Sequence, residues 1–248
     1  MIRRALLARD PGPRPSEDDF RWRGEGVSRL ENLSDIVFAF AVSFLVASAE
    51  VPATFAELTA SLAGFAAIGF GFAIVLLVWQ SHYVYFRRYG LEDSPTVWLN
   101  ALLLFLILLF VYPLRFVAEF VTDLSFGRFE SGEAIAAVLS LDQIPALQAV
   151  YSGGYAAVFG VFALLYWHAH RRADALDLSA VERVLTREQV ALGALHAGVA
   201  LSAIALASVL PRRWAWLSFW VYPLIGVLVP LVRRPYQRQY QDLTRAAG

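Results

Sequence analysis

The chain contains no cysteine and no lysine among its 248 residues. The absence of cysteine excludes disulfide bonds, thiol chemistry and cysteine-based metal sites. All 21 basic side chains are therefore arginines, which we interpret as a compositional bias rather than a sign of function. Charged residues are also scarce, at 17% compared with about 25% in an average soluble domain. Together with 58% hydrophobic residues and a mean hydropathy of +0.53, this scarcity indicates an integral membrane protein.

The motifs of common enzyme classes are missing as well. The sequence has no GxSxG nucleophile elbow, no HExxH zinc motif, no glycine-rich phosphate loop and no pair of intramembrane aspartates. We therefore expect no enzymatic activity, no cofactor and no bound metal. The expected surroundings are the lipid bilayer, with no nucleic-acid partner.

Six hydrophobic segments follow an N-terminal region rich in arginine, proline and acidic residues, and most of them are long enough to cross a bilayer as a helix. They lie at about 30–50, 58–86, 96–121, 147–168, 189–210 and 214–232. The sequence thus predicts an all-α polytopic membrane protein with six transmembrane helices per subunit. Its expected parts are a polar, disordered or surface-lying cytoplasmic segment at 1–26, a transmembrane domain at 27–234 and a cytoplasmic C-terminal tail at 235–248.

The distribution of arginine predicts the orientation, because basic residues accumulate on the cytoplasmic side of membrane proteins. If the N-terminus is cytoplasmic, nearly every arginine lies inside. The exceptions are Arg115, within the third span, and Arg128, Arg212 and Arg213 outside. We therefore expect both termini in the cytoplasm.

The first span does not resemble a lipid-facing helix. Its start is crowded with polar residues, among them Arg29, Ser34 and Asp35, and Glu50 closes its end. Polar groups at such a depth usually face a bundle interior or a watery path. We therefore expect this helix to line a path that the other segments support.

Three helix ends converge on the cytoplasmic side in this topology. The first span begins there, the second ends there with Trp79 and His82 on one helix face, and the third begins there with Asn100. Pairing lowers the cost of burying such polar groups. We expect a structural polar network made of Arg29, Ser34, Asp35, Trp79, His82 and Asn100.

A helical wheel of the first span separates this network from a second face. Asp35 lies about 140° from Phe40, so it can turn toward the second and third helices. The opposite stripe is where we expect function, whereas the network is expected to act as a clamp. The stripe consists of Leu33, Ile36, Phe40, Ser43 and Ala47, with Phe44 beside it.

These residues resemble the bacterial TMEM175 family of potassium channels over about residues 27–116. The family motif R-x-x-x-F-S-D stands here as RLENLSD from Arg29 to Asp35, with Leu33 in place of the motif phenylalanine. Further matches are Trp79, His82 and Phe86 in the second helix, and Asn100 and Pro113 in the third.

The resemblance implies a homotetramer in the bacterial inner membrane, with a central pore lined by the first helix and potassium as the permeant cation. In the family, a large aliphatic residue five positions after the motif aspartate narrows the pore. Phe40 stands at that position, and its larger ring would make a bulkier hydrophobic gate. The resemblance also implies that Ser43 assists potassium selection. The pore-lining set is then Ile36, Phe40, Ser43, Phe44 and Ala47.

Two points stay open at this stage. Glu50 would form an acidic ring at the outer mouth or end the helix in solvent. Two alternative functions also stay open. One is a proton-coupled secondary transporter that uses Asp35 and His82 as its titrating pair, and the other is a family member that no longer conducts because Phe40 closes its pore.

Overall fold

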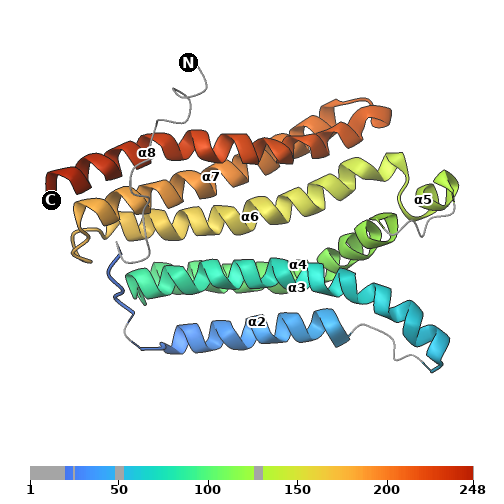
Figure 1. Cartoon of the computed structure of the whole chain (residues 1–248), viewed down its shortest axis with the longest axis horizontal. Helices are drawn as coiled ribbons and strands as arrows, with labels where there is room; N and C mark the ends of the chain where they lie inside the picture. The colour runs from blue at the N-terminus through green and yellow to red at the C-terminus, as the bar shows by residue number, and fades with distance from the viewer. Residues whose placement is uncertain (1–19, 25, 48–52, 126–130, 248) are drawn as a thin grey trace, which may run out of the picture.

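The computed structural model describes residues 20–24, 26–47, 53–125 and 131–247. Within this part of the chain the regular structure is helical throughout, and the long helices run side by side along the longest axis of the molecule (Figure 1). The elements are α2 (Arg29–Ala47), α3 (Phe55–Tyr89), α4 (Ser94–Ser125), α5 (Gly132–Val138), η2 (Leu141–Gln143), α6 (Ile144–Arg171), α7 (Ala180–Val209), η3 (Arg212–Leu224) and α8 (Ile225–Ala247). The predicted all-α class is confirmed.

Five stretches of the described chain are long and apolar enough to cross a membrane. They correspond to the second to sixth predicted spans: Ala66–Tyr89, Ser94–Phe120, Leu141–Arg171, Ala180–Val209 and Arg212–Ala246. The remaining predicted span, α2, has 19 residues and therefore a length of about 28 Å. Charged residues also interrupt its first two turns. The place of α2 in the membrane therefore stays a prediction.

Several boundaries differ from the expected ones. α7 begins at Ala180 instead of 189 because Ser179 and Glu182 form a capping box, with hydrogen bonds of 3.2 and 2.8 Å. The C-terminal helix α8 continues to Ala247, so the residues expected as a tail from 235 extend the last helix. The stretch between the third and fourth predicted spans contains two short helices, α5 and η2, in its described part.

The helices pack as two groups that meet at α4 and α6. α2 contacts α3 and α4 and lies at one edge of the bundle, whereas α7 packs between α6 and α8 (Figure 1). A buried aromatic cluster of Tyr85, Tyr89 and Tyr166 joins the two groups. The hydroxyl of Tyr89 also shares a 2.8 Å hydrogen bond with Thr186 of α7. The edge position leaves one side of α2 uncovered by its own subunit.

Residues Phe20–Gly24, here called the N-terminal strap, cross the end of the bundle at which α3 and α6 end and α7 begins. Phe20 is buried, with its ring 5.4 Å from that of Tyr89. The backbone N–H groups of the last two strap residues donate to the carbonyl of Arg87, and Arg87 donates back to the carbonyl of Gly24. The strap backbone packs closely against Gly90, the residue that follows α3. Gly90 has a φ of +56°, a backbone conformation that favours glycine.

A buried ion pair fixes the strap near its C-terminal end. The Arg23 guanidinium donates to both carboxylate oxygens of Glu182 at 2.8 Å, and further to the carbonyls of Leu176 and Asp177. The side chains of Arg23 and Glu182 are only 10% and 4% exposed. These five residues are therefore ordered and lie across the bundle end, with Arg21 and Trp22 exposed, so the disordered form of the expectation is wrong for them and the surface-lying form is not.

Candidate functional site

The sequence of α2 gives the helix two contrasting faces. Residues spaced by three and four are buried against α3 and α4: Glu31, Ser34, Phe38, Ala41 and Leu45. The opposite stripe is exposed on the subunit surface: Leu33, Ile36, Phe40, Ser43 and Phe44. The predicted division of the helix into these two faces agrees with the structure.

The exposed stripe is largely apolar. Ile36 and Phe40 are 67% and 59% exposed, and the rings of Phe40 and Phe44 stack with their centroids 6.3 Å apart. Ser43 donates its hydroxyl proton to the carbonyl of Ala39 at 2.9 Å, which leaves the oxygen lone pairs as acceptors. Ala47 ends α2, but its side chain lies outside the described part of the structure, as does the whole of Glu50.

The buried face carries a chain of hydrogen bonds across three helices. The side-chain amide of Asn100 in α4 donates to the hydroxyl of Ser34 in α2 at 2.9 Å. Its amide oxygen lies 2.9 Å from Nε2 of His82 in α3. Because this oxygen can only accept, the assigned arrangement requires the proton of His82 on Nε2. All three side chains are buried, and the hydroxyl of Ser34 also donates to the carbonyl of Leu30 at 2.8 Å.

A second contact ties α2 to α3 nearer the surface. The indole N–H of Trp79 donates to a carboxylate oxygen of Asp35 at 2.8 Å. Asp35 and His82 thus take different partners, and no hydrogen bond joins them within the described residues. Arg29, predicted as part of the network, is exposed and makes no side-chain hydrogen bond or ion pair in the described part of the subunit. The structure therefore brings together five of the six predicted residues in two separate contacts and leaves Arg29 apart.

The sequence analysis missed the contacts that hold the start and the middle of α2. Ser28 and Glu31 form a capping box, in which each side chain accepts the other's backbone N–H at 3.1 and 2.9 Å. The S-x-x-E spacing was a signal for this cap. Gly71 of α3 gives a close approach, because a Cβ there would lie 2.9 Å from the side chain of Leu45.

A further missed cluster joins the α3–α4 connection to the end of α6. Asp93 accepts from the hydroxyl of Thr96 at 2.7 Å and lies 2.8 Å from Nε2 of His168 and 3.3 Å from Arg172. Burial opposes ionisation of this carboxyl, but the hydrogen bonds from Thr96 and His168 outweigh it and lower the pKa of Asp93 below its usual 3.8. This group stabilises the bundle end and lies apart from the exposed stripe of α2.

No group of three His, Cys, Asp or Glu side chains that could hold a metal occurs among the described residues.

The fold and the site together define a polytopic helical membrane protein with a partly polar, half-exposed helix at its edge. The family model described as endosomal/lysosomal potassium channel TMEM175 matches residues 29–110, which include α2, α3 and most of α4. A potassium channel of Marivirga tractuosa is 34% identical over 234 residues, 90% of this chain and 95% of that protein. The chain belongs to the TMEM175 family, as the resemblance predicted.

Two other comparisons agree with this assignment. A potassium channel of Streptomyces collinus is 27% identical over 175 residues, which cover 67% of this chain and 77% of that protein. A crystal structure of a variant of the potassium channel MtTMEM175, in complex with a nanobody–MBP fusion protein, superimposes with a TM-score of 0.80. That channel is 32% identical, and the match covers 92% of this chain and 99% of that one. Because the relatives are ion channels, the prediction that the chain is not an enzyme is confirmed.

Proposed function

We propose that this protein is a passive, potassium-permeable cation channel in which four subunits surround a pore lined by α2. Membership of the TMEM175 family and the names of its relatives support potassium as the permeant ion. The observation that carries the assignment of α2 is its exposed stripe, because the other face of the same helix is already buried within the subunit. No cofactor is required beyond the permeant ion.

The polar residues of the exposed side favour a pore over a lipid contact. Asn32 and Ser43 are exposed together with the apolar stripe. Lipid would leave these groups in or near hydrocarbon, where polar side chains are costly. A water-filled path would solvate them, so the mixture of exposed polar and apolar residues fits a pore-lining helix.

Phe40 is the proposed constriction. Four copies of its ring around one axis would form an apolar girdle, and narrow apolar girdles gate ion flow by dewetting. Phe44 stacks on Phe40 one turn further along and would extend the girdle. Ser43 lies between them in sequence, and its outward oxygen would supply a cation ligand within this narrow region.

The proposed location is the bacterial inner membrane with both termini in the cytoplasm. α2 and α7 begin, and α3, α6 and α8 end, at the strap end of the bundle (Figure 1). Many arginines lie in or beside these helix ends, among them Arg23, Arg29, Arg87, Arg88, Arg171, Arg172, Arg183, Arg187 and Arg245. This accumulation supports a cytoplasmic orientation of that end.

The test is ion flux from liposomes that contain the purified protein, with potassium, sodium and proton gradients compared in parallel. We expect passive potassium flux that is not coupled to a second ion, and a strong increase for Phe40→Ala. The matched control is Phe105→Ala on α4, because Phe105 is 61% exposed but lies on a different helix. This control should leave the flux unchanged.

The outcomes separate the alternatives. An unchanged rate for Phe40→Ala in a conducting protein would remove Phe40 as the gate, and saturable flux coupled to protons would instead indicate a carrier. Silence of both the wild type and Phe40→Ala would indicate a non-conducting member of the family. Native mass spectrometry in detergent should give a tetramer, and a monomer would rule out the central pore.

A further inference from the structure

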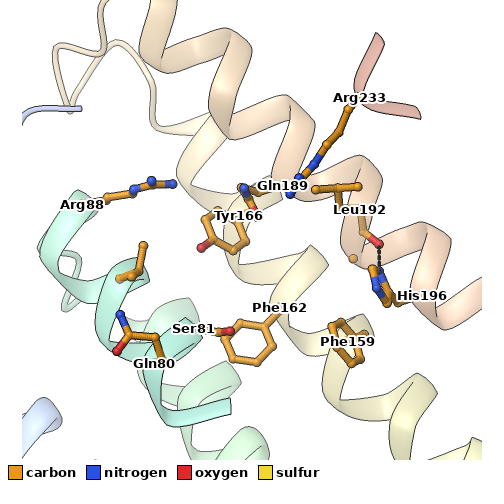
Figure 2. A pocket seen from close by; sticks show the side chains of 12 residues that line it. Gln80, Ser81, Arg88, Phe159, Phe162, Tyr166, Gln189, Leu192, His196 and Arg233 are labelled. Atoms are coloured by element: carbon orange, nitrogen blue, oxygen red, sulfur yellow. Dashed lines mark hydrogen bonds between the residues drawn. The ribbon is translucent and has the colours of Figure 1, made fainter. Parts of the chain in front are cut away.

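A second site, apart from the exposed stripe of α2, is lined by polar and aromatic residues of four other helices. It is a cavity of about 320 Å³ between α3, α6, α7 and α8, close to the strap end of the bundle (Figure 2). Gln80 and Ser81 on one wall are exposed, so the cavity opens to the surroundings of the subunit. Its volume is within the range of small-molecule sites, which begins at roughly 300 Å³.

Two hydrogen-bond donors point into the cavity without a protein acceptor. The Arg88 side chain extends from α3 toward α6 and α7, with its guanidinium 4.9 Å from the ring centre of Phe20 (Figure 2). It makes no hydrogen bond or carboxylate pair among the described residues. Tyr166 is only 6% exposed, yet its hydroxyl also lacks a hydrogen-bond partner in the described part of the chain. Because no protein group accepts from this hydroxyl, it is available to donate to a ligand in the cavity.

The charge around these donors is positive. Arg233 enters the cavity from α8, and its guanidinium lies 3.1 Å from the carboxylate of Glu188. Glu188 interacts electrostatically with both Arg233 and Arg88, so one carboxylate faces two arginines and the group keeps one net positive charge. Gln189 on α7 adds an amide between the two arginines (Figure 2).

The deeper wall of the cavity is apolar and aromatic. It includes Phe159, Phe162 and Leu192. The ring of His196 stacks on Phe159 with 4.5 Å between centroids, and its Nδ1 donates to the carbonyl of Leu192. A cationic mouth above an apolar wall suits an amphiphile with an anionic head.

We infer that this cavity binds an anionic phosphate group, with Arg88 as its main ligand and the Tyr166 hydroxyl as a second donor. Arginine matches phosphate because its planar N–H groups can bind two phosphate oxygens at once. Basic pockets between transmembrane helices near the cytoplasmic surface bind anionic lipid headgroups in this way. The apolar wall would hold the first part of an acyl chain, so a phospholipid uses more of the cavity than free phosphate does.

The experiment is native mass spectrometry of the full-length protein with phosphatidylglycerol, with zwitterionic phosphatidylcholine, and with inorganic phosphate as a competitor. We expect bound phosphatidylglycerol in preference to phosphatidylcholine. Arg88→Gln should weaken phosphatidylglycerol binding about tenfold, which corresponds to one charge-assisted hydrogen-bonding group. Tyr166→Phe keeps the ring and its packing, and it should weaken binding by about threefold.

The matched control is Arg171→Gln. Arg171 also lies at the strap end and stacks on an aromatic ring, that of Trp167, but does not line the cavity. Its removal should leave the affinity unchanged. If inorganic phosphate competes with phosphatidylglycerol in the wild type but not in Arg88→Gln, the site is supported and free phosphate is also a ligand. If inorganic phosphate does not compete, the site is supported as one for the lipid headgroup. Equal losses for Arg88→Gln and Arg171→Gln, an unchanged affinity of Tyr166→Phe, or no preference over phosphatidylcholine would overturn the inference.

Discussion

Replacement of Asn100 by leucine tests the clamp on α2 most directly. Asn100 is fully buried and bridges Ser34 of α2 and His82 of α3 through two hydrogen bonds of 2.9 Å. Leucine has a similar size but removes both hydrogen bonds; His82 then has no hydrogen-bond partner among the described residues, whereas Ser34 keeps its bond to the carbonyl of Leu30. Each unpaired buried polar group costs about 1–3 kcal/mol, while measured interhelical hydrogen bonds in membranes average about 0.6 kcal/mol. We therefore expect Asn100→Leu to lower the free energy of unfolding by about 2 kcal/mol.

The assay is SDS-induced unfolding of purified protein, followed by helical circular dichroism. Protein concentration and detergent must be constant, because subunit association contributes to the apparent stability. The chain offers a matched control in Asn32, its only other asparagine, which is exposed on α2. Asn32→Leu should change the stability by less than about 0.5 kcal/mol.

A double-mutant cycle then tests whether the hydrogen bonds form one unit. Ser34→Ala alone should cost about 1 kcal/mol because it removes the acceptor of the Asn100 amide. In the Asn100→Leu background the same change should cost little, since the bond is already lost. Additive effects, or an Asn100→Leu variant as stable as Asn32→Leu, would refute the clamp. A stable tetramer with only altered ion flux would also contradict it.

Two further predictions concern the strap end of the bundle. Arg23→Gln should lower the free energy of unfolding by about 3 kcal/mol because it leaves Glu182 as an uncompensated buried charge. The assay is thermal unfolding, and the control is Arg21→Gln, because the side chain of Arg21 is exposed. Equal effects of the two substitutions would contradict a specific role for the ion pair. Asp93→Asn should cost up to about 1 kcal/mol at pH 6, because its carboxylate is ionised and paired with His168 and Arg172. The folded pKa of Asp93 is lowered, so this stabilisation is complete above the usual 3.8 and is lost as the pH falls through the folded value. Unfolding measured from pH 6 to 3 should therefore show the difference between wild type and Asp93→Asn shrinking below about 3.8, and a difference that grows with acid would contradict the assignment.

The periodicity of α2 was sufficient to predict its two faces. Ser34, Phe38 and Ala41 recur every three or four residues and are buried, while Ile36 and Phe40 recur on the other side and are exposed. The alternation of spans further brought the start of α2, the end of α3 and the start of α4 to one end of the bundle. Local helix geometry and topology together therefore predicted the meeting of these three helix ends.

The sequence did not predict which side chains in that region form hydrogen bonds with each other. Trp79 binds Asp35 and His82 binds Asn100, although either donor had the right depth for either acceptor. The rotation of α3 about its own axis decides between them, and it depends on packing such as the close approach at Gly71. Arg29 was assigned to the network by depth alone, but its side chain is exposed and makes no hydrogen bond or ion pair among the described residues.

The sequence also did not predict the long-range ion pair or the end of the last helix. Arg23 and Glu182 are 159 positions apart, and nothing local to either residue identifies the other. The last helix was expected to end near 232 because its apolar character ends there and Pro235 follows. Hydropathy reports where a helix leaves the membrane, however, and α8 continues to Ala247 as an amphipathic helix beyond that point.

The two faces of α2 are mechanically linked if the helix lines the pore. Turning α2 by one residue position, about 100°, would carry Phe40 away from the axis. The same rotation would move Ser34 away from Asn100 and Asp35 away from Trp79, so it would break both contacts that hold the buried face. Side-chain motion of Phe40 breaks neither of them. The arrangement therefore favours a gate that opens by movement of the Phe40 ring on a fixed helix over one that opens by rotation of the helix.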